Sequence, residues 1–429
     1  MRRIIALFIV VSVALILLFL GNIFFGSVHI PPESVWAALT GGEVDAVTQF
    51  VVIESRLPQA ITALLAGASL SVSGLMLQTV FHNPLADPSI LGVNSGASLG
   101  VAIVMLALGG SVSAAGGALG TTVSTLGTTG DALCAIWNAA GATESTVKTM
   151  ECAVGTMGNA AGTIGNAAET MGNAAGTIEN TAETMGNAAG TIGNAAETMG
   201  NAVWAIISGL SGFFLIVLAA FIGAMLIIIL LLAFSKFVKS NLTLLIVGIM
   251  VGYVISSAIS LLNYSATEQG VHSYIIWGLG NFNGVGLRGM PFYAISLVLC
   301  VILSLTLVKP LNTLLMGSSY ARNLGTNLAH TRTKLLIVTG LIAAVVTAFC
   351  GPISFIGLAV PHIARMLSRC ANHRTLMPLT LLIGADISLI CALICTLPAN
   401  GTLIPLNVIT PLFGVPVILY VLLARREVK

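Results

Sequence analysis

Charged side chains are nearly missing from this sequence. Only 7% of the 429 residues are Asp, Glu, Lys or Arg, whereas soluble domains carry about 25%. Apolar residues take their place, with a hydrophobic content of 56% and a mean hydropathy of +1.01. This composition excludes a soluble globular protein and predicts an all-α, polytopic membrane protein. The net charge of +2 gives no indication of nucleic-acid binding.

Sequence patterns of metal sites and ATPases are also missing. The seven cysteines form no Cys-x-x-Cys pair and no Cys/His spacing of a zinc site, so we expect no bound metal. No Gly-Lys pair occurs, which excludes a Walker-type phosphate loop. Ion-driven carriers generally need acidic groups in the membrane, and Asp386 is the one acid inside an apolar run. We therefore expect no enzymatic activity and no bound cofactor, with ATP used by a separate subunit.

Ten apolar segments approach the roughly 20 residues that a membrane span requires. They lie near residues 4–25, 57–81, 89–108, 203–233, 242–264, 291–308, 333–350, 353–367, 376–397 and 405–424. With a cytoplasmic N-terminus, all basic residues except Arg56, Lys148 and Arg288 fall inside, as the positive-inside rule requires. We predict about ten transmembrane helices with both termini cytoplasmic. The first apolar run resembles a signal peptide but lacks a clean cleavage site, so it is interpreted as a span.

Residues 109–202 differ from the two apolar parts that flank them, residues 1–108 and 203–429. The segment is rich in Gly, Ala, Thr and Asn, and residues 149–204 repeat every seven positions. Heptads resemble a coiled coil, but each glycine costs a helix about 1 kcal/mol. We predict a flexible or weakly helical extracytoplasmic insertion, with an ordered domain as the alternative. The sequence leaves open whether its Cys134 and Cys152 form a disulfide.

Two groups of motifs interrupt the apolar segments. The first contains Arg56-Leu57-Pro58, Gly67-Ala68, Ser73-Gly74 and Asn83-Pro84-Leu85-Ala86, and the second runs from Gly351 to Arg365. Helix breakers are tolerated in membranes only where neighbouring groups satisfy the freed backbone, so both groups predict closely packed protein. Small residues beside a translocation path would show the same pattern, and the two interpretations stay open. His362 is interpreted as structural or interfacial, with a proton relay as the alternative.

In their order and spacing these motifs resemble the permease subunits of ATP-binding-cassette importers for iron-siderophore, haem and cobalamin, the FecCD type. The run Gly-Pro-Ile-Ser-Phe-Ile-Gly-Leu-Ala-Val-Pro-His-Ile-Ala-Arg at 351–365 carries most of the resemblance. It implies a cobalamin-permease-like bundle in the cell membrane, acting as a homodimer with two cytoplasmic ATPase subunits and an extracytoplasmic solute-binding protein. Ferric siderophore is the first expected substrate, with haem or cobalamin as alternatives within the family. An ion-coupled secondary transporter is the alternative class.

The resemblance also implies roles for single residues. Arg56, helped by Arg288, is a candidate to dock an acidic binding protein, and a snorkelling interfacial arginine is the alternative. A short interfacial helix within 316–325 is expected to contact the ATPase through Ser319, Ala321, Arg322, Leu324 and Gly325. The residues expected to serve translocation or structure are Gly67, Gly74, Asn83, Pro84, Gly351, Pro352, Gly357, Pro361 and His362.

The sequence departs from the family pattern at two places. Gln59 stands where a second Arg is common, and residues 403–407 replace a frequent Glu-Leu-Pro-x-Gly. These departures predict a docking surface with less positive charge than is usual for the family. Between them in the chain, residues 263–274 are predicted to form an outer polar loop.

Overall fold

The computed structural model describes residues 2–42, 44–89, 91–107, 212–238, 241–287, 289–397 and 404–424. Within these ranges all regular elements are helices, which confirms the predicted all-α class. Contacts divide the chain into two units, residues 1–111 with 216–429, and residues 112–215. The predicted 109–202 insertion with Cys134 and Cys152 lies outside the described residues, and so does Arg288.

The helices follow the predicted apolar segments closely. In chain order they are α1 (Arg2–Phe24), α2 (Pro32–Thr40), α3 (Ala46–Gln49), α4 (Leu57–Phe81), α5 (Val93–Ala102), α8 (Gly212–Phe237), α9 (Asn241–Ser265), α10 (Glu268–Gly278), α11 (Met290–Thr306), α12 (Val308–Leu314), α13 (Ser318–Asn323), α14 (Leu328–Cys350), α15 (Ile356–Ser368), α16 (His373–Thr396) and α17 (Leu406–Ala424). Two π-helical segments continue the α-helices, η1 (Phe50–Arg56) before α4 and η2 (Ile103–Ala107) after α5.

Six helices among the described residues are long and apolar enough to cross a membrane. They are Arg2–Phe24, Ala46–Phe81, Phe214–Ser235, Thr243–Ser265, Leu328–Cys350 and His373–Thr396. A seventh span forms if α11 and α12, which meet at a bend of 48°, are taken together. Three shorter apolar helices, Val93–Leu106, Ile356–Ser368 and Leu406–Val421, complete the set. Each of the ten predicted segments thus contains a helix, and the ten-span topology stays a prediction.

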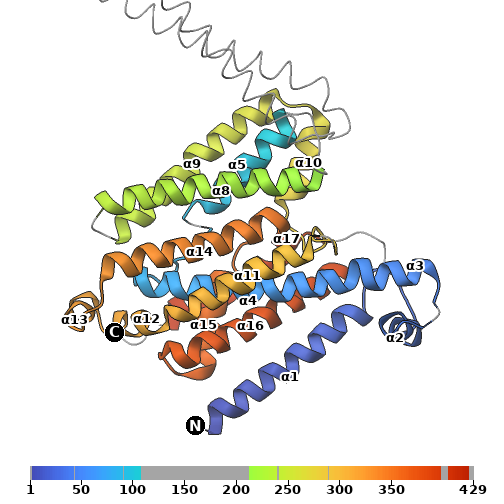
Figure 1. Ribbon diagram of the computed structural model, residues 1–429, viewed down its shortest axis with the longest axis horizontal. Coiled ribbons are helices and arrows are strands. Elements are labelled where there is room, and N and C mark those ends of the chain that lie inside the picture. Colours follow the sequence, from blue (N-terminus) through green and yellow to red (C-terminus); the bar gives the residue numbers. More distant parts are fainter. Residues whose placement is uncertain are drawn as a thin grey trace, which may run out of the picture. The chain divides into compact units, whose positions relative to one another are not determined.

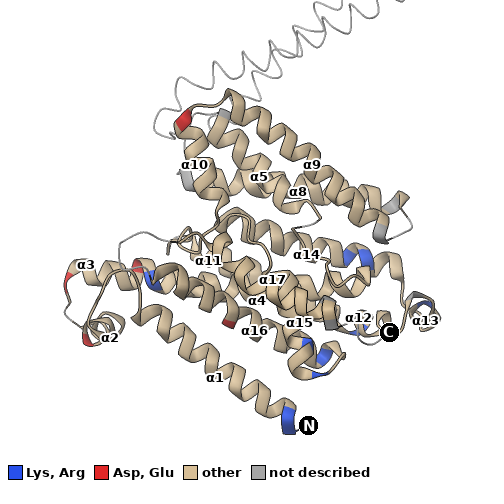
Figure 2. Cartoon of the chain, turned by 180° about the vertical axis from the view of Figure 1, so that it is seen from behind, with Lys and Arg blue, Asp and Glu red and all other residues tan. Residues whose placement is uncertain are grey.

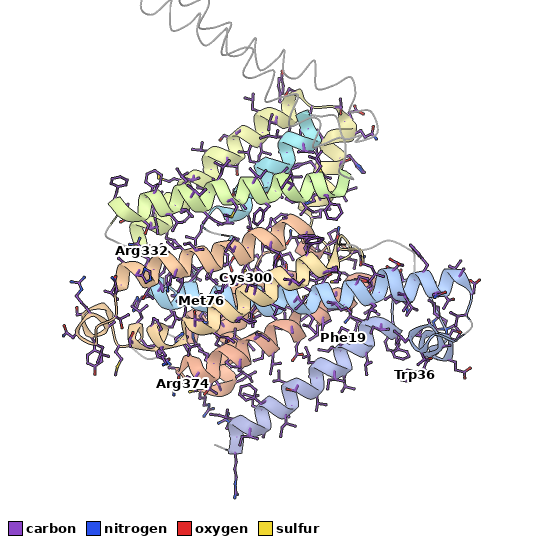
Figure 3. The ribbon with its side chains drawn as sticks, viewed as in Figure 1. Phe19, Trp36, Met76, Cys300, Arg332 and Arg374 are labelled. Carbon is purple, nitrogen blue, oxygen red and sulfur yellow. The ribbon has the colours of Figure 1, made fainter. Side chains whose placement is uncertain are left out.

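Helix α4 lies inside a bundle formed with α1, α11, α14, α15 and α16 (Figure 1). In its most apolar window 83% of the residues are buried, and Met76 points into the bundle (Figure 3). Glycine permits this packing, because a Cβ at Gly67 would overlap the Gly384 carbonyl oxygen and the Ser388 side chain on α16. The Ser388 hydroxyl donates a hydrogen bond to the Ala63 carbonyl at 2.6 Å. The small-residue run of α4 is therefore a helix-packing surface.

Helix α1 is much less covered by the chain. Only 6% of its most apolar window is buried, and side chains such as Ile9, Ile16 and Leu17 are exposed. An apolar, uncovered surface of this kind suits lipid contact. One polar group ties the helix to the bundle, because Asn22 Nδ2 donates to the Leu389 carbonyl of α16 at 3.0 Å.

Three element boundaries differ from the predictions. Residues 263–274, predicted as an outer polar loop, contain the start of α10, whose N-cap Thr267 accepts a hydrogen bond from the Gly270 N–H. Helix α5 starts at Val93 rather than near residue 89, where the predicted segment begins, because Gly92 has the positive φ of +80°. Helix α15 starts at Ile356 because the preceding Phe355 is also left-handed, with φ +70°. Local backbone conformation, rather than hydrophobicity, decides each of these boundaries.

Candidate functional site

A glycine contact brings the two groups of motifs together. Gly74 lies on α4 and Gly357 at the start of α15, and a Cβ at Gly74 would overlap the Gly357 carbonyl group. No side chain larger than hydrogen fits there without separating the helices. Gly357 in turn faces the Leu70 carbonyl and the Asp87 side chain. Two segments about 280 positions apart in sequence, as the contact between Gln78 and Leu358 also shows, thus form one packed site.

The turn after α4 is fastened to α15 by a histidine. His362 is buried, and its Nε2 lies 2.9 Å from the Pro84 carbonyl oxygen. A carbonyl oxygen only accepts, so Nε2 carries the proton and donates. Asn83 shapes the turn, because its Oδ1 accepts from the Leu85 N–H at 3.0 Å. This contact gives His362, Asn83 and Pro84 a defined place, and the role of His362 stays a prediction. Pro361, next to it, is buried inside α15.

Asp87 is a buried acid in the same turn. Its Oδ2 accepts from the Ser89 N–H at 3.1 Å and from the Ser89 hydroxyl. Burial raises the pKa of this carboxyl above its ordinary value of 3.8, and the two Ser89 bonds act in the opposite direction. Since burial is the larger effect, the turn favours the neutral acid more than water does.

Gln78 connects α4 to both ends of the same stretch of α15. Its amide nitrogen donates to the Leu358 carbonyl at 3.0 Å, and its Oε1 accepts from the Arg365 guanidinium at 2.7 Å. The buried amide is therefore satisfied on both sides, as buried polar groups require. Together with the contacts of Gly74 and His362, these bonds fix the position of α15 along the axis of α4.

The far end of the second motif group lies in a separate junction. Gly351 has φ +75°, and a Cβ there would overlap the Trp277 carbonyl oxygen. Asn407 Nδ2 donates to the Pro352 carbonyl at 2.7 Å and to the Gly278 carbonyl at 3.2 Å. Its Oδ1 accepts from the Ser354 N–H at 3.4 Å. Sequence reasoning noted residues 403–407 only as a departure, although an Asn among apolar residues is a signal for such a cap.

Arg56 is enclosed rather than displayed. The side chain is 4% exposed, and its Nη1 donates to the Ile23 and Phe24 carbonyls, each at 3.0 Å. Its Nη2 donates to the Val28 carbonyl. A cation at the last carbonyls of a helix satisfies orphan acceptors and complements the helix dipole. In this structure Arg56 caps α1, and its docking role stays a prediction.

The predicted ATPase-contact segment forms the short helix α13, which lies beside α12 at one end of the bundle (Figure 1). Within this segment Ala321 is buried, whereas Ser319, Arg322, Leu324 and Gly325 are exposed. The exposed apolar side chains Met316 and Tyr320 lie beside Arg322 in the chain. The Thr313 and Thr326 hydroxyls are hydrogen-bonded at 3.1 Å, which joins α12 to the end of this segment. The five predicted residues are thus divided into one anchor and four surface positions.

Helix α9 presents a polar stripe that sequence reasoning missed. Tyr253 and Tyr264 are 71% and 91% exposed, and three exposed serines lie between them at helical spacing, Ser256, Ser257 and Ser260. The Ser257 and Ser260 hydroxyls donate to carbonyls one turn earlier. The helix contains no charged residue. This face is therefore neutral, rich in oxygen atoms and uncovered by the described part of the chain.

Side chains that could bind a metal do not gather in the described residues. No group of three or more His, Cys, Asp or Glu side chains lies together there. The arrangement can pack helices closely, cap their ends and present surfaces at either end of the bundle. It is the architecture of a closely packed helical bundle.

Comparisons with known proteins agree with this architecture. The chain is 27% identical to the molybdate import system permease protein MolB of Haemophilus influenzae, over 90% of this chain and 84% of MolB. It is 26% identical to the vitamin B12 import system permease protein BtuC of Klebsiella pneumoniae, over 94% of this chain and 88% of BtuC. A solved structure described as an inward-facing conformation of a putative metal-chelate type ABC transporter shares the fold. Its TM-score is 0.65 at 23% identity, with 98% and 99% of the two chains covered.

The match to a protein family extends over most of the sequence. It covers residues 14–196 and 188–424, in the FecCD transport family. Both groups of motifs and the α4–α15 contact that joins them lie within these limits. The chain is a multi-pass membrane protein and a transport permease that belongs to the FecCD transport family.

Proposed function

We propose that this chain is the membrane subunit of an ATP-binding-cassette importer for a metal chelate. Two copies of the chain, two cytoplasmic ATPase subunits and an extracytoplasmic solute-binding protein make up the importer. ATP binding and hydrolysis switch the dimer between outward-open and inward-open states as a rigid-body change. The family and the names of its relatives, which include import permeases for molybdate and vitamin B12, support this proposal.

The surface of α13 is the observation that carries the proposal. This short helix is anchored by the buried Ala321, and the described chain leaves the side chains of Tyr320, Arg322 and Leu324 exposed. Apolar side chains around an arginine are typical of the centre of a protein–protein contact. An ATPase subunit that docks on this surface would have a direct mechanical connection to α12. We therefore propose that the energy for transport comes from an ATPase bound at this surface, rather than from an ion bound by a side chain in the membrane.

The distribution of charge supports a cytoplasmic place for this surface. Apart from Arg56, the described Lys and Arg gather at the end of the bundle that contains the N-terminus and α13 (Figure 2). The acids of α2 and α10, and Asp45 at the N-cap of α3, lie at the other end (Figure 2). Positive charge marks the cytoplasmic side of membrane proteins. We therefore orient the chain with both termini and α13 in the cytoplasm.

The neutral stripe of α9 supports a pathway at an interface between two copies. Tyr253, Ser256 and Ser260 offer hydroxyl groups without charge. Such a wall holds a bulky chelate weakly and lets it pass, so selectivity can rest with the binding protein. A second copy of α9 facing the first would enclose the path and cover the exposed stripe.

Ferric siderophore is the substrate that we propose first, because it is the broadest class of metal chelate. Haem and cobalamin are the alternatives within the same mechanism. Molybdate is a further candidate, because one relative is named as a molybdate import permease. All four would use the same α13 surface and the same α9 stripe. A competition experiment with the four solutes can therefore rank them in one preparation.

An ion-coupled carrier is the second candidate, and Asp386 is the observation that favours it. Asp386 is 8% exposed on α16, and its Oδ1 has no hydrogen-bond partner. Buried acids in membrane helices often bind the coupling ion of a carrier. The variant Asp386→Asn separates the two functions, because an ATP-driven importer keeps its uptake whereas an ion-coupled carrier loses it.

The test of the proposed function is reconstituted uptake. The chain is co-expressed with its ATPase and solute-binding subunits, placed in liposomes and supplied with ferric siderophore, haem, cobalamin or molybdate. We expect ATP-dependent accumulation of one solute, and its loss in Arg322→Glu through failure of ATPase docking. The matched variant Arg374→Glu carries the same charge change at the same end of the bundle, outside α13, and should retain uptake. Uptake that follows a proton or sodium gradient without ATP would refute the proposal.

A further inference from the structure

A chain of hydrogen bonds connects the α12–α13 segment to the buried helix α4. Its central member is His373, the first residue of α16, which is completely buried. Asn312 of α12 lies on one side of the ring, and Thr79 of α4 lies on the other. No motif discussed above includes Asn312 or Thr79.

The hydrogen atoms in this chain can be assigned one after another. Asn372 is the N-cap of α16, and its Oδ1 accepts from the Arg374 N–H at 3.0 Å. The group of Asn312 that lies 3.0 Å from this oxygen must therefore be its Nδ2. This leaves the Asn312 Oδ1 directed at His373.

The Asn312 oxygen fixes the state of the His373 ring. It accepts from the His373 backbone N–H at 2.8 Å and lies 3.1 Å from Nδ1. Since this oxygen can only accept, Nδ1 carries a proton. In the neutral ring Nε2 is then the acceptor, and the Thr79 hydroxyl lies 2.9 Å from it.

Thr79 has two acceptors for a single hydroxyl hydrogen. The Leu75 carbonyl lies 2.8 Å away, and His373 Nε2 lies 2.9 Å away. The hydrogen bond from the Thr79 hydroxyl to His373 therefore competes with its hydrogen bond to the Leu75 carbonyl within α4. A small shift of the ring changes which acceptor is served, so the contact responds to the position of α12.

We propose that His373 is a positioning residue that carries movement of the α12–α13 segment to α4. Force applied to α13 reaches α12 through the Thr313–Thr326 bond, then the ring through Asn312, and then α4 through Thr79. Helix α4 contacts α11, α14, α15 and α16, so one displacement reaches most of the bundle. This inference rests on the proposed function, in which an ATPase subunit docks on α13.

The test uses the complete importer in liposomes and measures ATP hydrolysis and solute uptake in the same vesicles. Thr79→Val keeps the shape of the side chain and removes the hydroxyl, whereas Thr79→Ser keeps the hydroxyl. We expect Thr79→Val to lower uptake per ATP hydrolysed by at least about fivefold, the lower end of typical coupling between sites. Binding of the ATPase subunit is unchanged, and Thr79→Ser stays near the wild type.

A second variant breaks the same connection from its other side. Asn312 is only half-buried, so Asn312→Ala removes the acceptor for His373 without emptying the core. It should lower uptake per ATP as Thr79→Val does, while the exposed Arg374→Ala does not. Wild-type ratios in both Thr79→Val and Asn312→Ala, or an equal loss in Thr79→Ser, would overturn the inference. If the wild-type chain itself shows no ATP-dependent uptake, the proposed function fails and this inference with it.

Discussion

Helices α4 and α9 carry similar small and polar residues in opposite surroundings. In the most apolar window of α4, 83% of the residues are buried, compared with 22% for α9. The serines and glycines of α4 contact α16 and α15 through backbone groups, whereas Ser256 and Ser260 of α9 are exposed. Sequence alone offered helix packing and a translocation path as interpretations of such residues. The comparison shows that one chain uses small residues for packing in α4, and we propose that it uses them for passage in α9.

The largest expected effect on the free energy of unfolding comes from filling the α4–α15 contact. Gly74→Leu forces a side chain into the Gly357 carbonyl, and we expect a loss of about 3 kcal/mol or more. Thermal unfolding of the purified chain measures it. The control is Gly21→Leu, since a Cβ at Gly21 meets no atom within 4 Å and should change stability by about 0.5 kcal/mol or less. Equal stability of the two variants would contradict the packing role of α4.

The next effect concerns the junction at Asn407. Asn407→Ala leaves the Gly278 and Pro352 carbonyls without their donor, at a cost of about 1 to 3 kcal/mol. The neighbouring Val408→Ala, which removes an exposed side chain, serves as the control. We expect only Asn407→Ala to lower the unfolding midpoint in a thermal scan. A midpoint that does not move would show that the 351–354 segment is held by its backbone alone.

Part of this structure could be predicted from the sequence. The helical class, the helix near each apolar run and the close packing at Gly67 and Gly74 follow from hydrophobicity and small-residue patterns. Helix α10 was missed because its amphipathic signal is weak, although Thr267 followed by Glu268 was a readable N-terminal signal. The burial of Arg56 could not be predicted, because its acceptors are carbonyls that become neighbours only after α1 and α4 have packed. The exposure of α9 could not be predicted either, because it depends on which helices pack against α9 in the folded chain.

A smaller effect depends on pH and on Asp87. Because burial raises the pKa of this carboxyl in the folded chain, the folded state holds the proton more tightly than the unfolded state does. Stability contributed by Asp87 is therefore full below pH 3.8 and declines as the pH rises through the raised folded value. Asp87→Asn removes the titrating group and should gain stability relative to the wild type as the pH rises. Unfolding midpoints from acidic to neutral pH measure this, and parallel curves for both proteins would exclude it.

The smallest effect on stability is expected at α9. Ser260→Leu adds bulk on an exposed face and should change the free energy of unfolding by about 0.5 kcal/mol or less. In reconstituted importer the same variant should lower uptake about tenfold, equivalent to a barrier raised by about 1.4 kcal/mol. Ser260→Ala, which removes the hydroxyl without adding bulk, should transport like the wild type. Normal uptake in Ser260→Leu would remove α9 from the pathway and end the contrast with α4.

The hydrogen bond between Asn22 and Leu389 has a consequence for the synthesis of the chain. Its two residues are separated by 367 positions, so the bond cannot form until α16 has left the ribosome. Until then the described neighbours of α1 are α2, η1, α4 and α15, without α16, which it contacts most. Helix α1 therefore gains its bond to α16 late in synthesis, and a translation product that stops before α16 would keep α1 less firmly attached to the bundle.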